Sequence, residues 1–128
     1  MDYFDDETAF KILKDHGFSD EDSRYAVDYA GGVPWILELV ISRGLSILDT
    51  LYRQTLSKIH ELLKGRKDLK EVLNLALKGE NLIEREDKKE EVQELVGSEV
   101  LFYDPINMLV GFQTKLHERA AREILGVN

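Results

Sequence analysis

Few side chains in this sequence have the type and spacing that catalysis needs. The three histidines, His16, His60 and His117, lie far apart and have neither HExxH nor HxxxH spacing, so no metal site is expected. Ser57 and His60 would share one face of a helix, but the nearest acid, Glu61, follows on another face, so no Ser/His/Asp arrangement can be placed. The absence of cysteine removes disulfides, thiolate zinc sites and thiol catalysis. We therefore expect no enzymatic activity from this chain alone.

The segment Gly31-Gly32-Val33-Pro34 is the one short motif that could contact a ligand. Two glycines allow close approach of a ligand to the backbone, but a glycine pair also ends a helix, so both interpretations stay open. The chain contains no GxxxxGK[ST] and no GxGxxG motif. It is therefore not expected to hold a nucleoside triphosphate by itself in the usual way.

Charge is unevenly distributed along the chain, whose 25 acids and 17 bases give a net charge of -8. Residues 1–28 sum to -6, residues 53–78 to +4 and residues 79–99 to -5. Such segments can steer a partner, although solvated helix faces have the same composition. The bases that could contact nucleic acid or an acidic partner are Arg53, Lys58, Lys64, Arg66, Lys67, Lys70, Lys88 and Lys89.

The length of 128 residues and the 43% hydrophobic content fit one compact domain or two small lobes with a shared core. The amino terminus, MDYFDDE, is acidic where a secretory signal is basic and apolar, which predicts a cytoplasmic protein. The most apolar stretch, residues 33–51, is interrupted by charges and cannot span a bilayer. Three Gln and four Asn beside abundant Lys, Arg and Glu are typical of a thermophile.

Apolar residues at helical spacing, with acidic or hydroxyl residues at the starts and glycines at the ends, predict seven helices. Their expected ranges are about 5–16, 20–30, 34–42, 46–64, 68–77, 88–96 and 114–125. Most aromatic side chains fall on apolar stripes, so we expect Tyr25, Tyr29 and Trp35 in the core rather than on a base-stacking surface.

The hydrophobic period changes to two after residue 99. Residues 100–103 and 108–112 flank Asp104-Pro105-Ile106-Asn107, which favours a type I turn and a β-hairpin. Three helices followed by a hairpin is the succession of a winged helix. The fold class is therefore mainly α: a three-helix lobe over residues 1–45, then a winged-helix domain with one hairpin and a C-terminal helix over residues 46–128. Its recognition helix, EDKKEEVQELVGSE, is acidic and would repel a DNA backbone.

Two stretches resemble one family. The run YAGGVPWILELV, after the acidic segment DDETAFKILKDHGF, is similar to the helical lid of archaeal P-loop ATPases of the STAND and AAA-related class. The later stretch VGSEVLFYDPINMLVGFQTKLHERAAREIL resembles the winged helix that follows the lid in those proteins. The resemblance implies that Gly31, Gly32 and Pro34 form a lid motif that faces the nucleotide when a P-loop core is present.

The Walker A and Walker B strands of that family are missing from these residues. ATP and Mg²⁺ are therefore implied only for the full-length family, and no cofactor is expected for this chain alone. We expect a non-catalytic regulatory or interaction module whose partner is a P-loop core, in the same chain or in another. The alternatives are a stand-alone winged-helix transcriptional regulator that binds DNA, and an oligomer formed through the sixth helix or the hairpin edge.

Overall fold

The computed structural model describes residues 3–127, and their fold is mainly helical with one antiparallel hairpin. By contact density the chain forms two compact units. The first runs to Gln54 and includes Thr114–Leu116; the second comprises Thr55–Gln113 and the residues from His117 onward. The expected fold class, a helical lobe followed by a winged-helix-like succession, is confirmed. The expected division at residue 45 stays a prediction.

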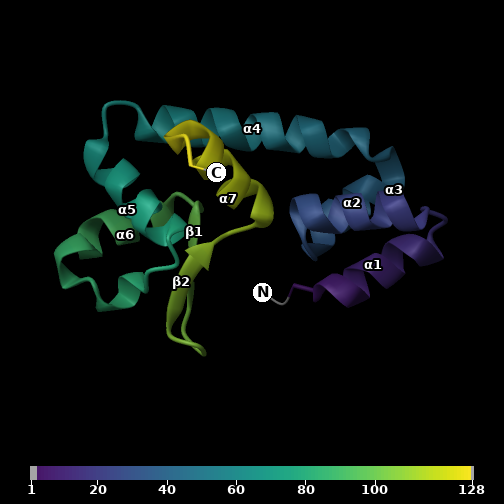
Figure 1. The fold of residues 1–128 in the computed structure, drawn as a ribbon, viewed down its shortest axis with the longest axis horizontal. Coiled ribbons are helices and arrows are strands. Elements are labelled where there is room, and N and C mark those ends of the chain that lie inside the picture. Colours follow the sequence, from purple (N-terminus) through teal and green to yellow (C-terminus); the bar gives the residue numbers. More distant parts are fainter. Residues whose placement is uncertain (1–2, 128) are drawn as a thin grey trace. The chain divides into compact units, whose positions relative to one another are not determined.

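The first unit is built on helices α1 (Asp6–Asp15), α2 (Asp20–Ala30) and α3 (Pro34–Arg43), drawn in purple and blue in Figure 1. Local chemistry sets their ends. The Asp5 carboxylate accepts a hydrogen bond from the Thr8 amide at 2.7 Å, and the Ser19 hydroxyl accepts one from the Asp22 amide at 3.0 Å. Pro34 begins α3, where its missing N–H costs nothing.

Eleven buried apolar side chains form the core of the first unit. They come from α1, α2, α3, the first half of α4 (Ser46–Leu63) and the first turn of α7 (Lys115–Leu125). Phe10 and Tyr29 pack against this core as half-buried residues. The core members are Ala9, Leu13, Ala26, Val27, Ala30, Val33, Ile36, Leu37, Val40, Leu48 and Leu116.

Two aromatic residues that we expected in this core are exposed. Tyr25 is 51% exposed and Trp35 is 47% exposed. Small residues take the inward positions of α2, where Ser23, Ala26, Val27 and Ala30 are buried. Because these small side chains let α2 pack closely, Tyr25 lies at the edge of the apolar stripe, with its ring 5.6 Å from that of Tyr29.

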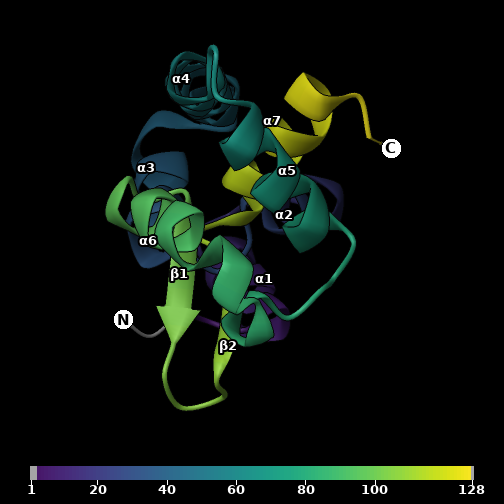
Figure 2. The ribbon, with the colours of Figure 1, turned by 90° about the vertical axis from the view of Figure 1, so that its left-hand side faces the viewer.

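The second unit contains the rest of α4, then α5 (Lys67–Leu77), two single-turn 3-10 helices, η1 (Leu82–Glu84) and η2 (Glu86–Lys88), and α6 (Lys89–Gly97). Helix α6 packs on α5 and on strand β1 (Leu101–Asp104), as Figure 2 shows. Strand β2 (Leu109–Phe112) pairs antiparallel with β1, so that Leu101 lies opposite Phe112. The remaining turns of α7 complete the unit.

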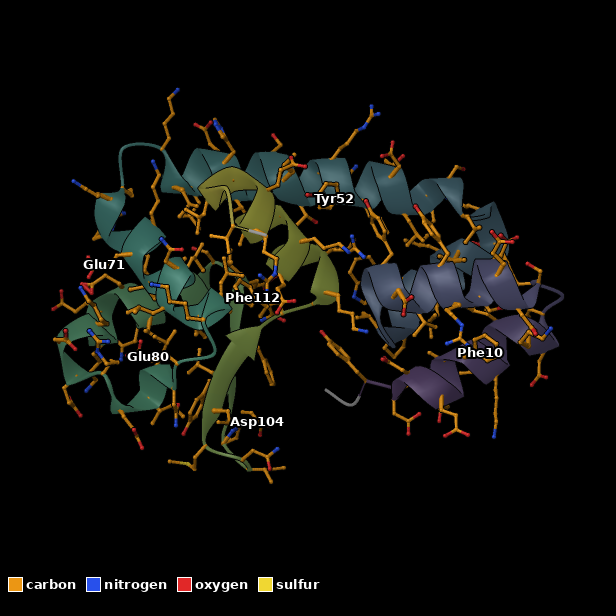
Figure 3. All side chains as sticks on the ribbon, viewed as in Figure 1. Phe10, Tyr52, Glu71, Glu80, Asp104 and Phe112 are labelled. Carbon is orange, nitrogen blue, oxygen red and sulfur yellow. The ribbon has the colours of Figure 1, made fainter. Side chains whose placement is uncertain are left out.

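The hairpin turn follows the prediction in its chemistry. The Asp104 carboxylate accepts hydrogen bonds from the amides of Ile106 and Asn107, at 3.0 and 3.2 Å. In Figure 3 Asp104 lies at the turn end of the hairpin and Phe112 at the opposite end. Each strand starts one residue later than expected. Glu99, two residues before β1, and Met108, directly before β2, have positive φ of 63° and 54°, which extended strand backbone does not allow.

Candidate functional site

The glycine-proline motif lies at a sharp corner between α2 and α3. Gly31 caps α2 with φ of 74°, a conformation that favours glycine, and its amide donates to the Val27 carbonyl at 2.8 Å. Val33 then has an extended backbone, and Pro34 opens α3. We name Gly31–Pro34 the GGVP corner. Its local geometry follows directly from the order of residue types in the motif.

The second glycine is required by a close approach within the chain itself. A Cβ added at Gly32 would lie 1.9 Å from the carbonyl oxygen of Phe4, and the Phe4 amide donates to the Gly32 carbonyl at 2.8 Å. No larger residue fits without moving one of the two backbones. Gly32 therefore serves the structure, whether or not the GGVP corner also contacts a ligand.

Lys115, at the start of α7, contacts the same corner, although no sequence pattern indicates it. Its side-chain carbons lie 3.5 to 3.6 Å from the position of a Cβ on Gly31. Its ammonium group donates to the Val27 carbonyl at 3.4 Å and lies 3.2 Å from an Asp6 carboxylate oxygen. A lysine near the C-terminal carbonyls of a helix is favourable to the helix dipole. No local pattern signals the contact, because 84 residues separate Lys115 from Gly31.

Only the last part of the GGVP corner is open to a ligand. Gly31, Gly32 and Val33 are buried, Pro34 is half-buried, and Trp35 beside it is 47% exposed. Proline and tryptophan offer a rigid apolar edge and a flat ring but no positive charge. This surface can cover an apolar or aromatic group, and it cannot neutralise phosphates.

Several of the predicted basic residues form ion pairs within the chain. Arg66 binds Glu94 of α6 at 2.8 Å and Asp68 at 2.9 Å. Lys88 lies 2.9 Å from Glu71 of α5, and Arg53 lies 3.1 Å from Asp49. The pKa of Glu94 is lowered chiefly by its hydrogen bonds from Arg66, and the pKa of Lys88 is raised chiefly by its hydrogen bond to Glu71.

Two of these ion pairs, Arg66–Glu94 and Lys88–Glu71, connect α5 and the residue before it with α6 and the residue before it. They leave α6, the helix expected in the recognition position, acidic. The predicted recognition helix has two lysines. Lys88, the last residue of η2, is paired with Glu71, and Lys89, the first residue of α6, is exposed and has no partner among residues 3–127. Glu90 and Glu94 are also exposed on α6. A negatively charged helix is unsuited to the phosphate-lined major groove. The exposed acids of α6 are therefore in line with the expectation that this helix would repel a DNA backbone.

The histidines do not come together in a reactive group. His117 is largely buried, and its pKa is lowered to about 4 by burial and by the nearby charge of Lys58. The Nδ1 of His16 donates to the Ile12 carbonyl, 2.8 Å away, and His60 is exposed on α4. Within residues 3–127 no group of three His, Cys, Asp or Glu side chains is arranged to hold a metal ion.

The second unit has an apolar groove of about 520 Å³ beside the hairpin. Leu82, Val92 and Val96 line it together with Tyr103 and Val110 of the two strands. The hairpin adds further exposed apolar side chains: Phe102, Ile106, Met108 and Leu109. The sequence pattern did not indicate this groove, because its walls come from the single-turn helices, α6 and both strands.

Nearly the whole chain is similar to archaeal proteins that are named as uncharacterized ATP-binding proteins. One from Methanocaldococcus jannaschii is 34% identical over 92% of this chain, and a second from the same organism is 32% identical over 92%. A relative from Pyrococcus abyssi is 27% identical over 98% of the chain. The chain spans only about two fifths of the length of these relatives, 38% to 39%.

No protein-family model matches the chain. The search of solved structures likewise gives no match. None of the helices in residues 3–127 combines the length and the low charge that crossing a membrane requires. The cytoplasmic location stays a prediction from the acidic amino terminus. The comparisons thus connect the chain with archaeal ATP-binding proteins through a region that is a minor part of each.

Proposed function

We propose that this chain is a non-catalytic module that completes the nucleotide site of a P-loop ATP-binding core of the STAND and AAA-related kind. The observation that supports it is the similarity to archaeal ATP-binding proteins over 92% of the chain or more, against about two fifths of their length. A region of this kind lacks the phosphate-binding loop, which the core would supply. The core can belong to the same polypeptide or to a partner.

In this proposal the GGVP corner lies against the apolar part of the bound nucleotide. Pro34 and the exposed Trp35 supply the contact surface, and Gly31 and Gly32 give the corner its shape. The residues of the corner fit a base or sugar and do not fit phosphate or Mg²⁺, since they offer no charged group. When bound to the core, ATP supplies the phosphoryl chemistry, and this chain orients the nucleotide and limits the access of water.

A domain exchange tests the proposal. The region of the 34% identical Methanocaldococcus jannaschii relative that matches this chain is replaced by residues 1–128, and ATP binding of the hybrid is measured by calorimetry. We expect the hybrid to bind ATP more tightly than the relative with the region deleted. We also expect Pro34→Ala with Trp35→Ala to reverse most of that gain, because the open contact surface is removed.

The matched control is Phe102→Ala with Leu109→Ala, which removes two exposed apolar side chains from the hairpin. This control hybrid should bind ATP as the unmutated hybrid does. Equal affinity with and without this chain, in a hybrid whose circular dichroism shows a folded protein, would contradict the proposal.

A further inference from the structure

Helix α5 and the turn before it carry a surplus of exposed lysines. Lys64 follows α4, Lys67 and Lys70 lie in the first turn of α5, and Lys78 caps the end of that helix. All four side chains belong to the second unit and are exposed. Within residues 3–127, none of them has an ion-pair or hydrogen-bond partner in the structure. We name these four residues the lysine stripe.

The helical period places Lys67 and Lys70 of α5 and its C-cap residue Lys78 on one side. At about 100° per residue, Lys67, Lys70 and Lys78 fall within roughly 80° of one another. The buried residues of the same helix, Leu69, Val72 and Leu73, centre roughly 150° away, on the other side of the helix. Packing of α5 on its own unit therefore leaves the lysine stripe facing solvent.

The acids of α5 do not cancel this positive charge, because other bases pair with them. Glu71, labelled on α5 in Figure 3, lies 2.9 Å from Lys88. Asp68 lies 2.9 Å from Arg66, which lowers the pKa of its carboxyl group. Glu80, beyond the end of the helix, pairs with Arg85. Arg66 is shared with Glu94 and Arg85 with Asp87, so these three bases meet five acids. The four unpaired lysines outweigh the remaining acidic charge and leave this group of residues with a net charge of about +2.

We propose that the lysine stripe binds the phosphate backbone of duplex nucleic acid without reading its sequence. The stripe from Lys67 to Lys78 is about 16 Å long at 1.5 Å per residue. A duplex carries about one charge per 1.7 Å of its axis, so a stripe of this length faces several phosphates. Lysine is a flexible point charge that suits phosphate contact without base recognition. Helix α6 is acidic, and its Glu94 is paired with Arg66. In this mode of binding α6 does not enter the major groove of the duplex, as the recognition helix of a standard winged helix does.

The test is the binding of a fluorescein-labelled 20-base-pair duplex of random sequence to the full chain, followed by anisotropy between 25 and 200 mM KCl. Four phosphate contacts predict a slope of log affinity against log salt of about -3.6, a loss of about 100-fold between 50 and 200 mM. Lys67→Gln, Lys70→Gln and Lys78→Gln together should reduce the slope to about -1 and weaken binding at 50 mM at least about 10-fold.

The matched control is Lys11→Gln, Lys14→Gln and Arg43→Gln, which removes the same charge from exposed positions of the first unit. It should keep the wild-type slope, and circular dichroism should show that both triple variants are folded. No binding of the duplex at 25 mM salt would overturn the proposal, as would equal losses in the two triple variants. Because this assay contains no ATP and no P-loop core, its outcome is independent of the proposed nucleotide role.

Discussion

At the scale of single residues, the two glycines of the GGVP corner should respond differently to the same added methyl group. Gly31→Ala places a non-glycine residue at φ of 74° and should lower the free energy of unfolding by about 1 to 2 kcal/mol. Gly32→Ala must also separate its backbone from Phe4, where the added Cβ would lie 1.9 Å from the carbonyl oxygen. We therefore expect a larger loss, above about 2 kcal/mol, in urea unfolding.

Gly97 provides the control for this comparison. It is the last residue of α6, and a Cβ there meets no atom within 4 Å. Gly97→Ala should be neutral or stabilising by up to about 1 kcal/mol, because alanine favours the helix. If Gly32→Ala unfolded at the same urea concentration as Gly97→Ala, the close approach of Phe4 to Gly32 would not exist in solution.

His117 should make stability depend on pH in a range where carboxyl groups contribute little. Its pKa is about 4 in the folded chain, below the usual 6.5, because burial and Lys58 disfavour the charged form. Protonation then favours the unfolded chain as pH falls below 6.5. Its stabilising effect is complete above pH 6.5 and declines by about 1.4 kcal/mol per pH unit down to pH 4.

Urea unfolding at pH 7, 6 and 5 measures this dependence. His117→Asn should flatten the curve over that range, whereas His60→Asn, at an exposed position of α4, should leave it unchanged. Carboxyl groups with lowered pKa values, such as Asp68 and Glu94, lose their contribution only at lower pH. An unaltered pH dependence in His117→Asn would show that another group titrates.

Burial of individual aromatic residues is where prediction from the sequence was least accurate. The period of α3 correctly indicates an apolar helix, but Ile36, Leu37 and Val40 are its buried residues, and Trp35 is exposed. A hydrophobic period locates a face without locating its edges, since the edges depend on what packs against the helix. The contact of Lys115 with the GGVP corner could not be predicted either, because it depends on how segments far apart in the sequence pack together.

At the scale of elements, apolar packing rather than charge should hold α6 in place. Leu95 is the fully buried residue of this helix. Leu95→Ala should lower the free energy of unfolding by about 2 to 5 kcal/mol, because it removes buried methyl groups and leaves a cavity. Glu90→Ala, at an exposed position of the same helix, should stay within about 0.5 kcal/mol of the wild type in urea unfolding. Equal effects would contradict the placement of Leu95 in the core.

The ion pair between the turn before α5 and α6 should contribute less than this packing. Arg66→Gln and Glu94→Gln each remove the contact of 2.8 Å between two partly exposed side chains. Either change should lower the melting temperature by less than Leu95→Ala does, because exposed charges are screened by water and salt. A double-mutant cycle should show a coupling that disappears in 1 M NaCl. Coupling that persists in high salt would mean that the pair is shielded from solvent.

Helix boundaries were predicted well because their signals are local. The predicted range of α2, residues 20–30, is that of the structure, and α4 and α5 differ from their predictions by one residue. Capping by Ser19 and termination by glycine depend only on neighbouring residues. The single-turn helices η1 and η2 were not predicted, since one turn is too short to produce a period.

At the scale of the whole molecule, the chain does not divide simply along its sequence. Thr114–Leu116 belongs to the first unit, although the residues on either side belong to the second. Leu116 is buried in the core of the first unit, and Lys115 contacts Asp6 and the Val27 carbonyl. Charge and periodicity along the chain indicated two lobes. They did not indicate that Thr114–Leu116 belongs to the first unit, because contacts between distant segments leave no local pattern.

The proposed dependence on a P-loop core predicts the behaviour of the isolated chain toward ATP. Trp35 is the single tryptophan and lies beside Pro34, so its fluorescence reports directly on the open part of the GGVP corner. Titration with ATP and Mg²⁺ up to about 1 mM should leave this fluorescence unchanged, because the corner lacks the positive charge that phosphates require. In the hybrid with the core of the Methanocaldococcus jannaschii relative, the same titration should change it.

The control for both titrations is adenosine, which has the base and sugar without the phosphates. Adenosine should leave the Trp35 fluorescence of the isolated chain unchanged. It should bind the hybrid more weakly than ATP does, because the core supplies the phosphate contacts. Micromolar binding of ATP by the isolated chain, with turnover, would contradict a non-catalytic module. A change in Trp35 fluorescence only in the hybrid would locate the nucleotide beside the GGVP corner. That result would mean that the core binds the phosphates of the nucleotide and that this chain covers its base or sugar.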